Sequence, residues 1–416
     1  MLTAPVLPLP VRLYNGARRL AGRVGVPLPS LDPDHLIARA RKNTGLADLG
    51  PDSFREPLQR LVASLESDAG LHPLGRSIAA TQLVSNLENR LHLHDWIARE
   101  PTITQGAVSR PILIVGMART GTSILHELFG QDPSVRVPAS WEVLTPAPPP
   151  ERASYANDPR IALCDESLAQ TERLIPDFRR MHRMAAHLPQ EDVAMTALEF
   201  TSMLFEASFR LPSYTAWFHH EADMAPAYRI HRKFLQLLQW RCPAERWVLK
   251  TPGHLWSLEA CLAEYPDACL VQTHRDPLSV LSSLTSLCTT LRALASDTVD
   301  PHDIAREWQA LNDIAYDASI DARESGLVDP SRVIDIHFAE FMSDPFVKIR
   351  EIYEKFDMEF TPAAEARMRR YLETHTTEEH GKHRHRFEDT GLVLGEARER
   401  VKRYQEYFDV PSEIAA

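Results

Sequence analysis

Apolar side chains recur at helical spacing through the first hundred residues of the chain. Leu58, Leu61 and Leu65 illustrate the three- and four-residue intervals, which return over residues 78–97. This is the period of amphipathic helices that bury one side. The pattern predicts a helical N-terminal extension over residues 1–105.

A different pattern follows this extension, where short continuous apolar runs rich in branched residues alternate with helical stretches. Such runs are typical of strands that are buried on both faces of a parallel sheet. The alternation of strand and helix favours an α/β fold. We therefore predict an α/β domain over residues 106–416, with strands at residues 110–116, 246–250, 268–273 and 332–336.

Prolines interrupt this domain at Thr145-Pro-Ala-Pro-Pro-Pro150. Proline lacks the backbone donor that helix interiors and central strands need, so the segment predicts a linker or a lid hinge. Beyond it, periodic apolar positions without strand-like alternation predict a helical insertion over residues 151–242. Its expected helices cover residues 158–184, 190–209 and 226–241.

Composition narrows the classes of function. The 416 residues carry a formal net charge of −11, which disfavours the broad basic surface of nucleic-acid-binding proteins, so we expect no nucleic-acid partner. The five cysteines include no CxxC pair, so neither a disulfide framework nor a zinc site is indicated. No apolar run approaches the ~18 residues that span a bilayer, and no secretory signal opens the chain. We expect a cytoplasmic protein.

The first two dozen residues are basic and amphipathic. Four arginines are interleaved with apolar side chains there, and no acidic residue occurs before Asp32. We favour a segment packed on the body of the protein, but the same pattern is typical of a weak anchor at a membrane surface. Peripheral membrane contact is therefore the alternative, through Arg12, Arg18, Arg19 and Arg23.

A glycine-bearing turn joins the first strand to a helix expected to start near Thr122. The turn, Gly116-Met-Ala-Arg-Thr-Gly-Thr-Ser123, gathers backbone N–H groups at a helix N-terminus, an arrangement that binds phosphate or sulfate. Arg119 adds charge, and the Thr122 and Ser123 hydroxyls add donors. The nucleotide-triphosphatase motif GxxxxGK[ST] is not met, because Thr122 stands where its lysine belongs. A nucleotide-dependent kinase is therefore the weaker alternative, and a noncatalytic nucleotide-binding protein a further one.

The stretch Arg119-Thr120-Gly121-Thr122-Ser123 resembles the 5′-phosphosulfate loop of sulfotransferases that use PAPS (3′-phosphoadenosine 5′-phosphosulfate). A second segment, with Arg275 at the end of a strand and Ser283 eight residues later, resembles the family's 3′-phosphate site. The likeness is nearest to the large bacterial-type branch with a helical N-terminal extension. It implies a P-loop-like parallel sheet of about four or five strands flanked by helices. It also implies PAPS as co-substrate, adenosine 3′,5′-bisphosphate as product, and no metal.

The second segment also suits an anion on physical grounds. Arg275 ends a strand at the edge where α/β folds bind ligands. Pro277 is favoured in the first turn of a helix, and Ser283 lies two turns along it. We therefore expect Arg275 and Ser283 to face one phosphate.

Sulfuryl transfer needs a base for the acceptor proton and positive charge near the leaving oxygen. Glu142, after the loop helix and a short strand, resembles the base of protein-tyrosine sulfotransferases and would be partly desolvated beside Trp141. His254 follows Lys250-Thr-Pro-Gly and resembles the Lys-Thr-His segment of cytosolic sulfotransferases, with two extra residues. Glu142 is favoured as the base over His254, and Lys250 is the expected cation at the bridging oxygen.

A basic, histidine-rich stretch covers residues 375–387. In the family that the chain resembles, a basic loop near the C-terminus closes over the 3′-phosphate and adenine, and Arg384 and Arg386 are the candidates for this contact. The loose spacing of His380, His383 and His385 does not match a zinc site, so we expect no metal there.

The acceptor depends on the helical insertion and on how the N-terminal helices cover the sheet. Aromatic side chains in the insertion suit a lipid, terpenoid or phenolic alcohol, although such residues are more often plain core. The predicted activity is transfer of a sulfuryl group from PAPS to a hydroxyl or amine of a small-molecule, lipid or sugar acceptor, by in-line displacement. The acceptor's identity and the oligomeric state stay open.

Overall fold

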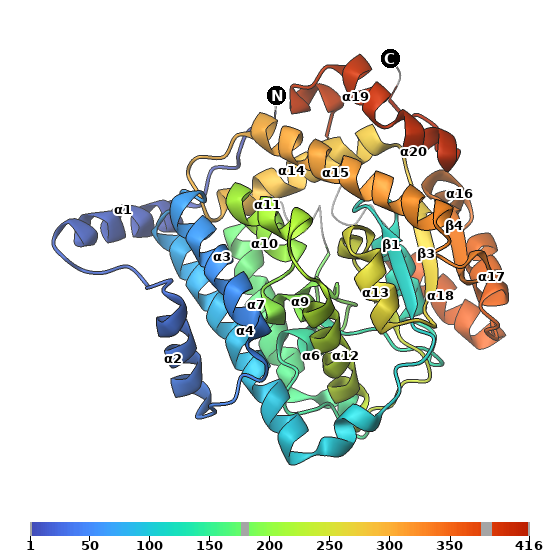
Figure 1. The fold of residues 1–416 in the computed structure, drawn as a ribbon, viewed down its shortest axis with the longest axis horizontal. Coiled ribbons are helices and arrows are strands. Elements are labelled where there is room, and N and C mark those ends of the chain that lie inside the picture. Colours follow the sequence, from blue (N-terminus) through green and yellow to red (C-terminus); the bar gives the residue numbers. More distant parts are fainter. Residues whose placement is uncertain (1, 176–182, 376–384, 415–416) are drawn as a thin grey trace.

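The computed structural model describes residues 2–175, 183–375 and 385–414 (Figure 1). Within these residues the strands form one parallel sheet in the order β2-β1-β3-β4. All four predicted strands are present, so the prediction of a parallel α/β fold is confirmed. Their bounds are Ile112–Gly116 (β1), Val248–Lys250 (β2), Cys269–His274 (β3) and Val333–His337 (β4).

The register of the sheet brings the predicted site segments to one edge. Ile114 of β1 is the partner of Lys250 in β2 and of Val271 in β3, and Gly116 is the partner of Thr273. Parallel strands end along a common edge, which is where α/β folds bind ligands. The turn after β1, the Lys250 side chain and Arg275 after β3 therefore converge there.

A single residue extends the sheet beyond β2. Arg136 forms an isolated parallel bridge with Trp247. Its backbone N–H donates to the carbonyl of Arg246 at 2.9 Å, and its carbonyl accepts from Val248 at 2.8 Å. The short strand expected before Glu142 is thus reduced to one paired residue.

The N-terminal region is helical, as the apolar spacing predicted. Asp32 caps the second helix by accepting from His35, and a proline occupies the first turn, two features that favour helix initiation. In Figure 1 these helices form the blue layer beside the rest of the molecule. They are α1 (Leu9–Arg23), α2 (Pro33–Thr44), α3 (Arg55–Ser67) and α4 (Pro73–Arg99).

Helices also dominate the chain between β1 and β2, but the insertion is more broken than predicted. The single helix expected over residues 190–209 is interrupted, because Phe200 has a φ of 58° and Ser202 then caps a new helix. The helix expected over residues 158–184 ends at Leu174. The helices are α5 (Thr122–Phe129), α6 (Ser140–Leu144), α7 (Pro159–Leu174), α9 (Val193–Thr196), α10 (Met203–Ser208), α11 (Pro212–His220) and α12 (Ala225–Gln239).

Helices after β2 cover the sheet and complete the chain. Several begin with an aspartate cap followed by proline: Asp276, Asp300 and Asp344 each accept a backbone N–H of the first turn. The helices are α13 (Leu258–Glu264), α14 (Pro277–Ala293), α15 (Pro301–Glu324), α16 (Phe338–Ser343), α17 (Pro345–Lys355), α18 (Pro362–Thr374), α19 (Leu394–Arg400) and α20 (Lys402–Tyr407).

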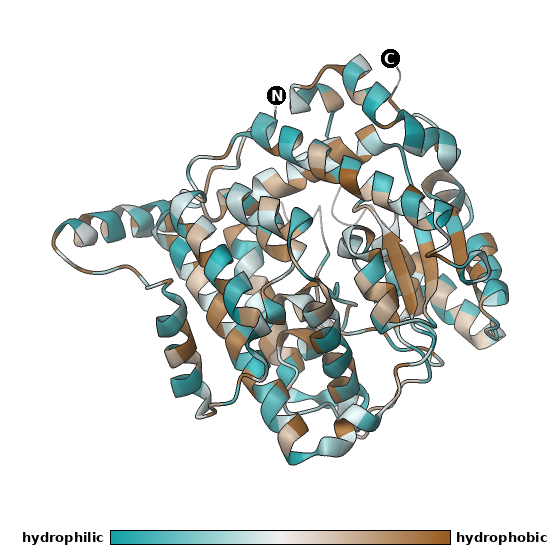
Figure 2. Cartoon of the chain, in the orientation of Figure 1, coloured by the Kyte–Doolittle hydropathy of each residue, from teal (hydrophilic) through white to brown (hydrophobic). Residues whose placement is uncertain are grey.

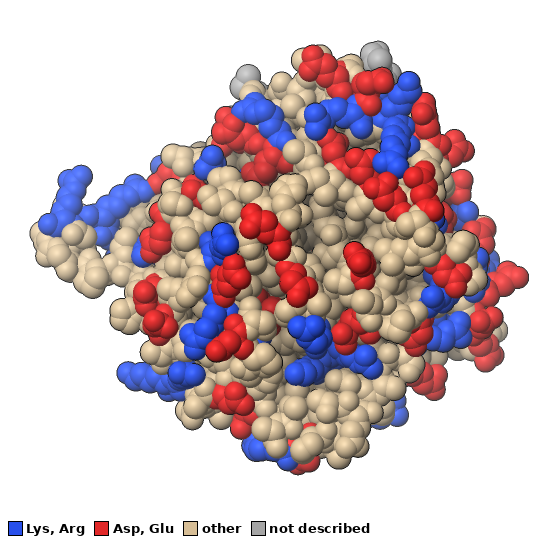
Figure 3. Space-filling view, in the orientation of Figure 1, with Lys and Arg blue, Asp and Glu red and all other residues tan. Residues whose placement is uncertain are grey.

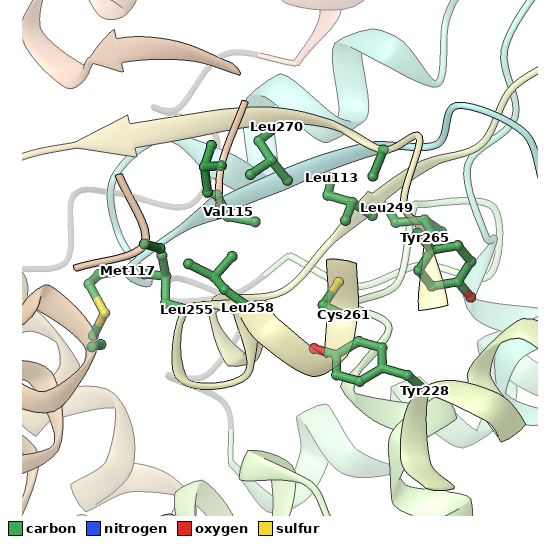
Figure 4. Close-up of a cluster of buried hydrophobic side chains, with 14 of the residues drawn as sticks. Leu113, Val115, Met117, Tyr228, Leu249, Leu255, Leu258, Cys261, Tyr265 and Leu270 are labelled. Carbon is green, nitrogen blue, oxygen red and sulfur yellow. The ribbon is translucent and has the colours of Figure 1, made fainter. Parts of the chain in front are cut away.

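Alternate strand residues enter two cores on opposite faces of the sheet. Leu113 and Val115 of β1 join a cluster with α12 and α13, whereas Ile112 and Ile114 join a cluster with α5 and α17. Burial on both faces explains why β1 is apolar throughout, and the brown colour of the sheet in Figure 2 shows this apolar character. Figure 4 shows the first cluster, in which Leu113 lies among Leu249, Leu270 and Tyr265.

A third core joins the N-terminal helices to the insertion. It contains side chains of α2, α3 and α4 together with Phe200 and the aromatic residues of α10 and α11. Arg90 of α4 forms an ion pair with Glu199, and their side chains are only 1% and 3% exposed. The Arg90 guanidinium also lies 4.6 Å from the centre of the Phe54 ring. The two regions therefore bury a common interior.

Acidic and basic side chains are mixed over most of the face seen in Figure 3. Among the helices of the described residues, none combines the length and apolar character needed to cross a bilayer.

Candidate active site

The turn after β1 is shaped by residues in unusual backbone conformations. Gly116 has a φ of 149°, and a Cβ atom there would lie 2.1 Å from the Thr273 hydroxyl oxygen, so only glycine fits beside β3. Arg119 and Gly121 are left-handed, with φ values of 72° and 89°. The chain then enters α5 at Thr122, as predicted. The resulting turn at a helix N-terminus suits an anion.

Two of the three hydroxyls in the turn are buried. The Thr120 hydroxyl donates to the carbonyl of Met117 at 2.6 Å and lies 2.6 Å from the Thr273 hydroxyl, so it holds the shape of the turn. Thr122 is also buried, whereas Ser123 is exposed. Ser123 is therefore the hydroxyl of this turn that is best placed to meet a ligand.

The structure brings Arg119, Arg275 and Ser283 together from two distant parts of the chain. Arg119 Nε donates to Ser283 Oγ at 3.1 Å, and Arg275 Nη1 donates to the Arg119 carbonyl at 3.0 Å. Burial lowers the pKa of the Arg119 guanidinium, and the positive charge of Arg275 lowers it further. Two neighbouring cations in a partly desolvated place favour an anion between them.

Arg275 already binds a carboxylate of its own chain. Its Nε and Nη2 atoms each donate to Glu413 at 2.8 Å, and the guanidinium lies 4.1 Å from the centre of the Phe338 ring. Asp276 holds the tail in place by accepting from the N–H groups of Glu413 and Ile414, at 2.7 and 3.0 Å. Sequence reasoning missed Glu413, because no motif links it to a residue 138 positions away.

Lys250 lies beside the turn, with Glu191 as its partner. Lys250 Nζ donates to Ser123 Oγ at 3.3 Å and forms an ion pair with Glu191. The lysine side chain is 3% exposed and the glutamate side chain 25% exposed. Glu191 thus presents a carboxylate next to the helix N-terminus. It carried no recognisable signal in the sequence, since it lies in the irregular part of the insertion.

His254 is buried in a cluster of polar side chains that is hydrogen-bonded to the Lys250 backbone. Its Nε2 atom lies 2.9 Å from Asp192 Oδ2, and its Nδ1 atom lies 2.9 Å from the Tyr228 hydroxyl. His231 contacts the same Asp192 oxygen at 3.0 Å, and the Asp192 N–H donates to the Lys250 carbonyl. The cluster therefore fixes the segment that carries Glu191 onto the end of β2.

The charge state of this cluster follows from its burial and its partners. Burial alone would lower the pKa of His254, but Asp192 and Cys261 outweigh it and raise that pKa to about 10. Burial would raise the pKa of Asp192, but His254 and His231 outweigh it and lower that pKa. At neutral pH, His254 is therefore an imidazolium paired with a carboxylate.

Glu142 is fully buried and bonded to three donors. Arg136 Nη2 donates to it at 2.5 Å, the Ala139 N–H at 2.9 Å and the Tyr155 hydroxyl at 3.2 Å. The Ala139 bond caps the first turn of α6. Partial desolvation was expected at Glu142, and the structure places it in full burial within an ion pair.

The basic stretch near the C-terminus lies only partly within the described residues. Arg384, His380 and His383 fall outside them. His385 Nδ1 lies 2.6 Å from the hydroxyl of Ser282, the neighbour of Ser283 on α14. Arg386 has a side chain that is 68% exposed and lies 3.8 Å from Asp389. The described part of the chain holds no group of three or more His, Cys, Asp or Glu side chains that suits a metal ion.

Comparison with known proteins agrees with this geometry. The sequence profile of the sulfotransferase family matches residues 111–362, which include the turn, Lys250, Arg275 and Ser283. A curated relative is omega-hydroxy-beta-dihydromenaquinone-9 sulfotransferase Stf3 of Mycobacterium bovis. It is 27% identical over 279 residues, which cover 64% of this chain and 67% of the relative.

Two solved structures share nearly the whole fold. Sulfotransferase STF9 from Mycobacterium avium is 29% identical, with a TM-score of 0.84 over 93% of this chain and 99% of that one. Sulfotransferase STF1 from Mycobacterium tuberculosis H37Rv is 30% identical, with a TM-score of 0.79 over 88% of this chain and 97% of that one. Both likenesses favour sulfuryl transfer over the kinase alternative. The chain belongs to the sulfotransferase family, and it is a sulfuryl-transferring enzyme.

Proposed function

We propose that the enzyme takes its sulfuryl group from PAPS and transfers it to a hydroxyl of a lipid-like acceptor. The observation that carries the proposal is the meeting of Arg119, Arg275 and Ser283 at the N-terminus of α5. Two arginines and a helix N-terminus can bind two separate anionic groups of one ligand. PAPS has such groups in its 5′-phosphosulfate and its 3′-phosphate.

In the proposed donor site, two segments of the chain bind different parts of PAPS. The turn of residues 119–123 binds the 5′-phosphosulfate through its N–H groups, with the Ser123 hydroxyl as a further donor. Arg275 and Ser283 bind the 3′-phosphate, which replaces the Glu413 carboxylate on Arg275. Arg386 adds charge from the segment that reaches Ser282 through His385. Arg384, outside the described residues, keeps its predicted role in the same contact.

Lys250 is the proposed cation beside the oxygen of the leaving group. Its ammonium group lies next to Ser123 at the mouth of the turn and is almost fully buried. A buried ammonium stabilises charge that develops on the bridging oxygen as the S–O bond breaks. Adenosine 3′,5′-bisphosphate then leaves with that oxygen and its electron pair.

Glu191 is the proposed base. Glu142 is enclosed by three donors, and the His254 imidazolium has no free lone pair at neutral pH, so neither is open to an acceptor proton. Glu191 is the carboxylate that is both partly exposed and paired with Lys250. In the proposed step the acceptor oxygen bonds to sulfur while its proton passes to Glu191. Glu142 and His254 then serve as structural and positioning residues.

A thermal-shift titration tests the donor site, because a ligand that binds only the folded state raises the melting temperature. We expect adenosine 3′,5′-bisphosphate to stabilise the wild type. The Arg275→Ala variant should bind it about 10- to 100-fold more weakly, since charged hydrogen bonds contribute about 1.5–3 kcal/mol each. Arg306→Ala is the matched control, since that exposed arginine pairs with surface Asp303. Stabilisation by ATP with Mg²⁺ alone would overturn the proposal.

The acceptor class rests on the relative's name and on the apolar insertion. Stf3 is named for an omega-hydroxyl on a menaquinone derivative, and we extend a lipid alcohol of that general kind to this chain. A panel of lipid, phenolic and sugar alcohols with labelled PAPS tests this, and transfer to sugars alone would refute it. The proposal places the enzyme in the cytoplasm, where it would meet such a lipid at a membrane surface.

A further inference from the structure

Helix α1 is fixed to the protein along one side only. Val11 is 6% exposed and Asn15 is 4% exposed, and α1 packs against α4. Asn15 Oδ1 accepts from the Leu74 N–H at 2.9 Å, in the first turn of α4. Figure 1 shows that α1 and the segment after it extend away from the body of the molecule. The orientation of α1 is therefore defined, and its other side faces outward.

The outward side carries an apolar stripe. Leu9, Leu13 and Leu20 are 58%, 64% and 63% exposed, and Val24, just beyond the helix, is 78% exposed. Their spacing places them on one side of the helix, about 160° from Val11 and Asn15 at 100° per residue. A leucine stripe that faces away from the core adds nothing to folding. Contiguous exposed apolar surface of this kind marks an interaction site.

Positive charge lies beside the stripe. Arg12 and Arg23 are both exposed and flank the leucines, and no acidic residue precedes Asp32 although the whole chain has a net charge of −11. Figure 3 shows the basic side chains at the projecting end of the molecule. Arg19 pairs with Asp297 and Arg18 donates to the Pro27 carbonyl, so these two also hold the helix in place. The local charge is thus opposite to that of the protein and complementary to an anionic surface.

We infer that α1 docks the enzyme onto an anionic lipid bilayer. The leucine stripe enters the boundary between headgroups and acyl chains, and Arg12 and Arg23 contact the lipid phosphates. Each arginine near such a surface strengthens binding about fivefold. The inference deepens the proposed function, because a lipid acceptor would be met at that surface, but its evidence lies outside the donor site.

Vesicle co-sedimentation of the full chain tests the docking helix. We expect stronger binding to phosphatidylcholine vesicles that contain phosphatidylglycerol than to phosphatidylcholine alone. The Leu13→Gln/Leu20→Gln variant should bind at least about tenfold more weakly, since each leucine removed from the acyl boundary loses its apolar burial. Leu163→Gln is the matched control, because Leu163 is 65% exposed on α7, and it should bind like the wild type.

A charge variant and an oligomer measurement complete the test. Arg12→Gln/Arg23→Gln should bind both vesicle types equally, and added salt should weaken only the wild type. Equal binding by the wild type and the double-leucine variant would overturn the inference. So would sedimentation velocity that shows a dimer dissociated by the leucine changes, because a second copy would then cover the stripe.

The failure of this inference is separable from failure of the proposed function. The leucine variant should keep the full thermal shift with adenosine 3′,5′-bisphosphate. A persistent shift with no vesicle binding by the wild type refutes only the docking helix. Vesicle binding without a nucleotide shift refutes only the donor site.

Discussion

At the scale of single residues, the site depends on which carboxylates water can reach. Glu142 and Glu191 are both paired with a cation, but only Glu191 has an exposed part. An enclosed carboxylate stabilises the fold through its donors, whereas an accessible one can take a proton from a substrate. In the proposed mechanism, exposure therefore separates Glu142 as the structural glutamate from Glu191 as the base.

Two glutamine variants distinguish these roles. Glu191→Gln should lower kcat by about 10²- to 10⁴-fold, the usual contribution of a general base. Its affinity for adenosine 3′,5′-bisphosphate should be unchanged. Glu142→Gln should lower the melting temperature instead, because Arg136 loses its buried partner. Steady-state turnover, nucleotide titration and thermal unfolding give the three readouts, and a catalytic loss confined to Glu142→Gln would return the base to that residue.

The buried His254 gives stability a defined pH dependence. Its pKa is raised from 6.5 to about 10 in the folded protein, so its contribution is complete below the unfolded value and is lost as the pH rises toward 10. Asp192, His231, Tyr228 and Cys261 surround it. Removing one partner of a buried pair costs about 3–5 kcal/mol. The melting temperatures of the wild type and His254→Gln should therefore differ most below the unfolded pKa of 6.5 and converge above pH ~10. A difference independent of pH would contradict this.

At the scale of elements, the C-terminal tail after α20 lies on the proposed donor site. Glu413 holds two nitrogen atoms of Arg275, so a phosphate that binds there has to displace it. Glu413→Gln should therefore bind adenosine 3′,5′-bisphosphate several-fold more tightly by calorimetry. Glu399→Gln, on an exposed side chain of α19, is the control. Weaker binding by Glu413→Gln would show that the tail orients Arg275 for the nucleotide instead.

The sequence predicted well the elements that form because of residues close together in the chain. Strand β1 is a continuous apolar run because both faces of the sheet are covered there, and the turn before Thr122 is marked by its glycines. The break at Phe200 depends on packing against Phe54 and Phe205, contacts that no local pattern encodes. Glu191 and Glu413 were missed for the same reason, since only the fold brings them to Lys250 and Arg275.

At the scale of the whole molecule, we expect the N-terminal helices and the insertion to unfold as one unit, because they share a core. Leu58 of α3 is fully buried in the core that also holds Phe205 and Tyr214. Leu58→Ala should cost about 2–5 kcal/mol. Hydrogen exchange should then accelerate in α10 and α11 as well as in α3, because all three share that core. Acceleration confined to α3 would show that the N-terminal region is an independent domain.

The buried pair of Arg90 and Glu199 has a consequence for recombination between relatives. Each residue lies on a different segment, and either one alone would be an uncompensated charge in a closed interior. A chimaera that exchanges only the insertion, in search of a new acceptor preference, would pair Arg90 and Phe54 with side chains from a different protein in place of Glu199 and Phe200. Exchange of both segments together keeps the pair intact. An exchange aimed at the acceptor therefore has to include both segments, because the pair joins residues that lie 109 positions apart in the chain.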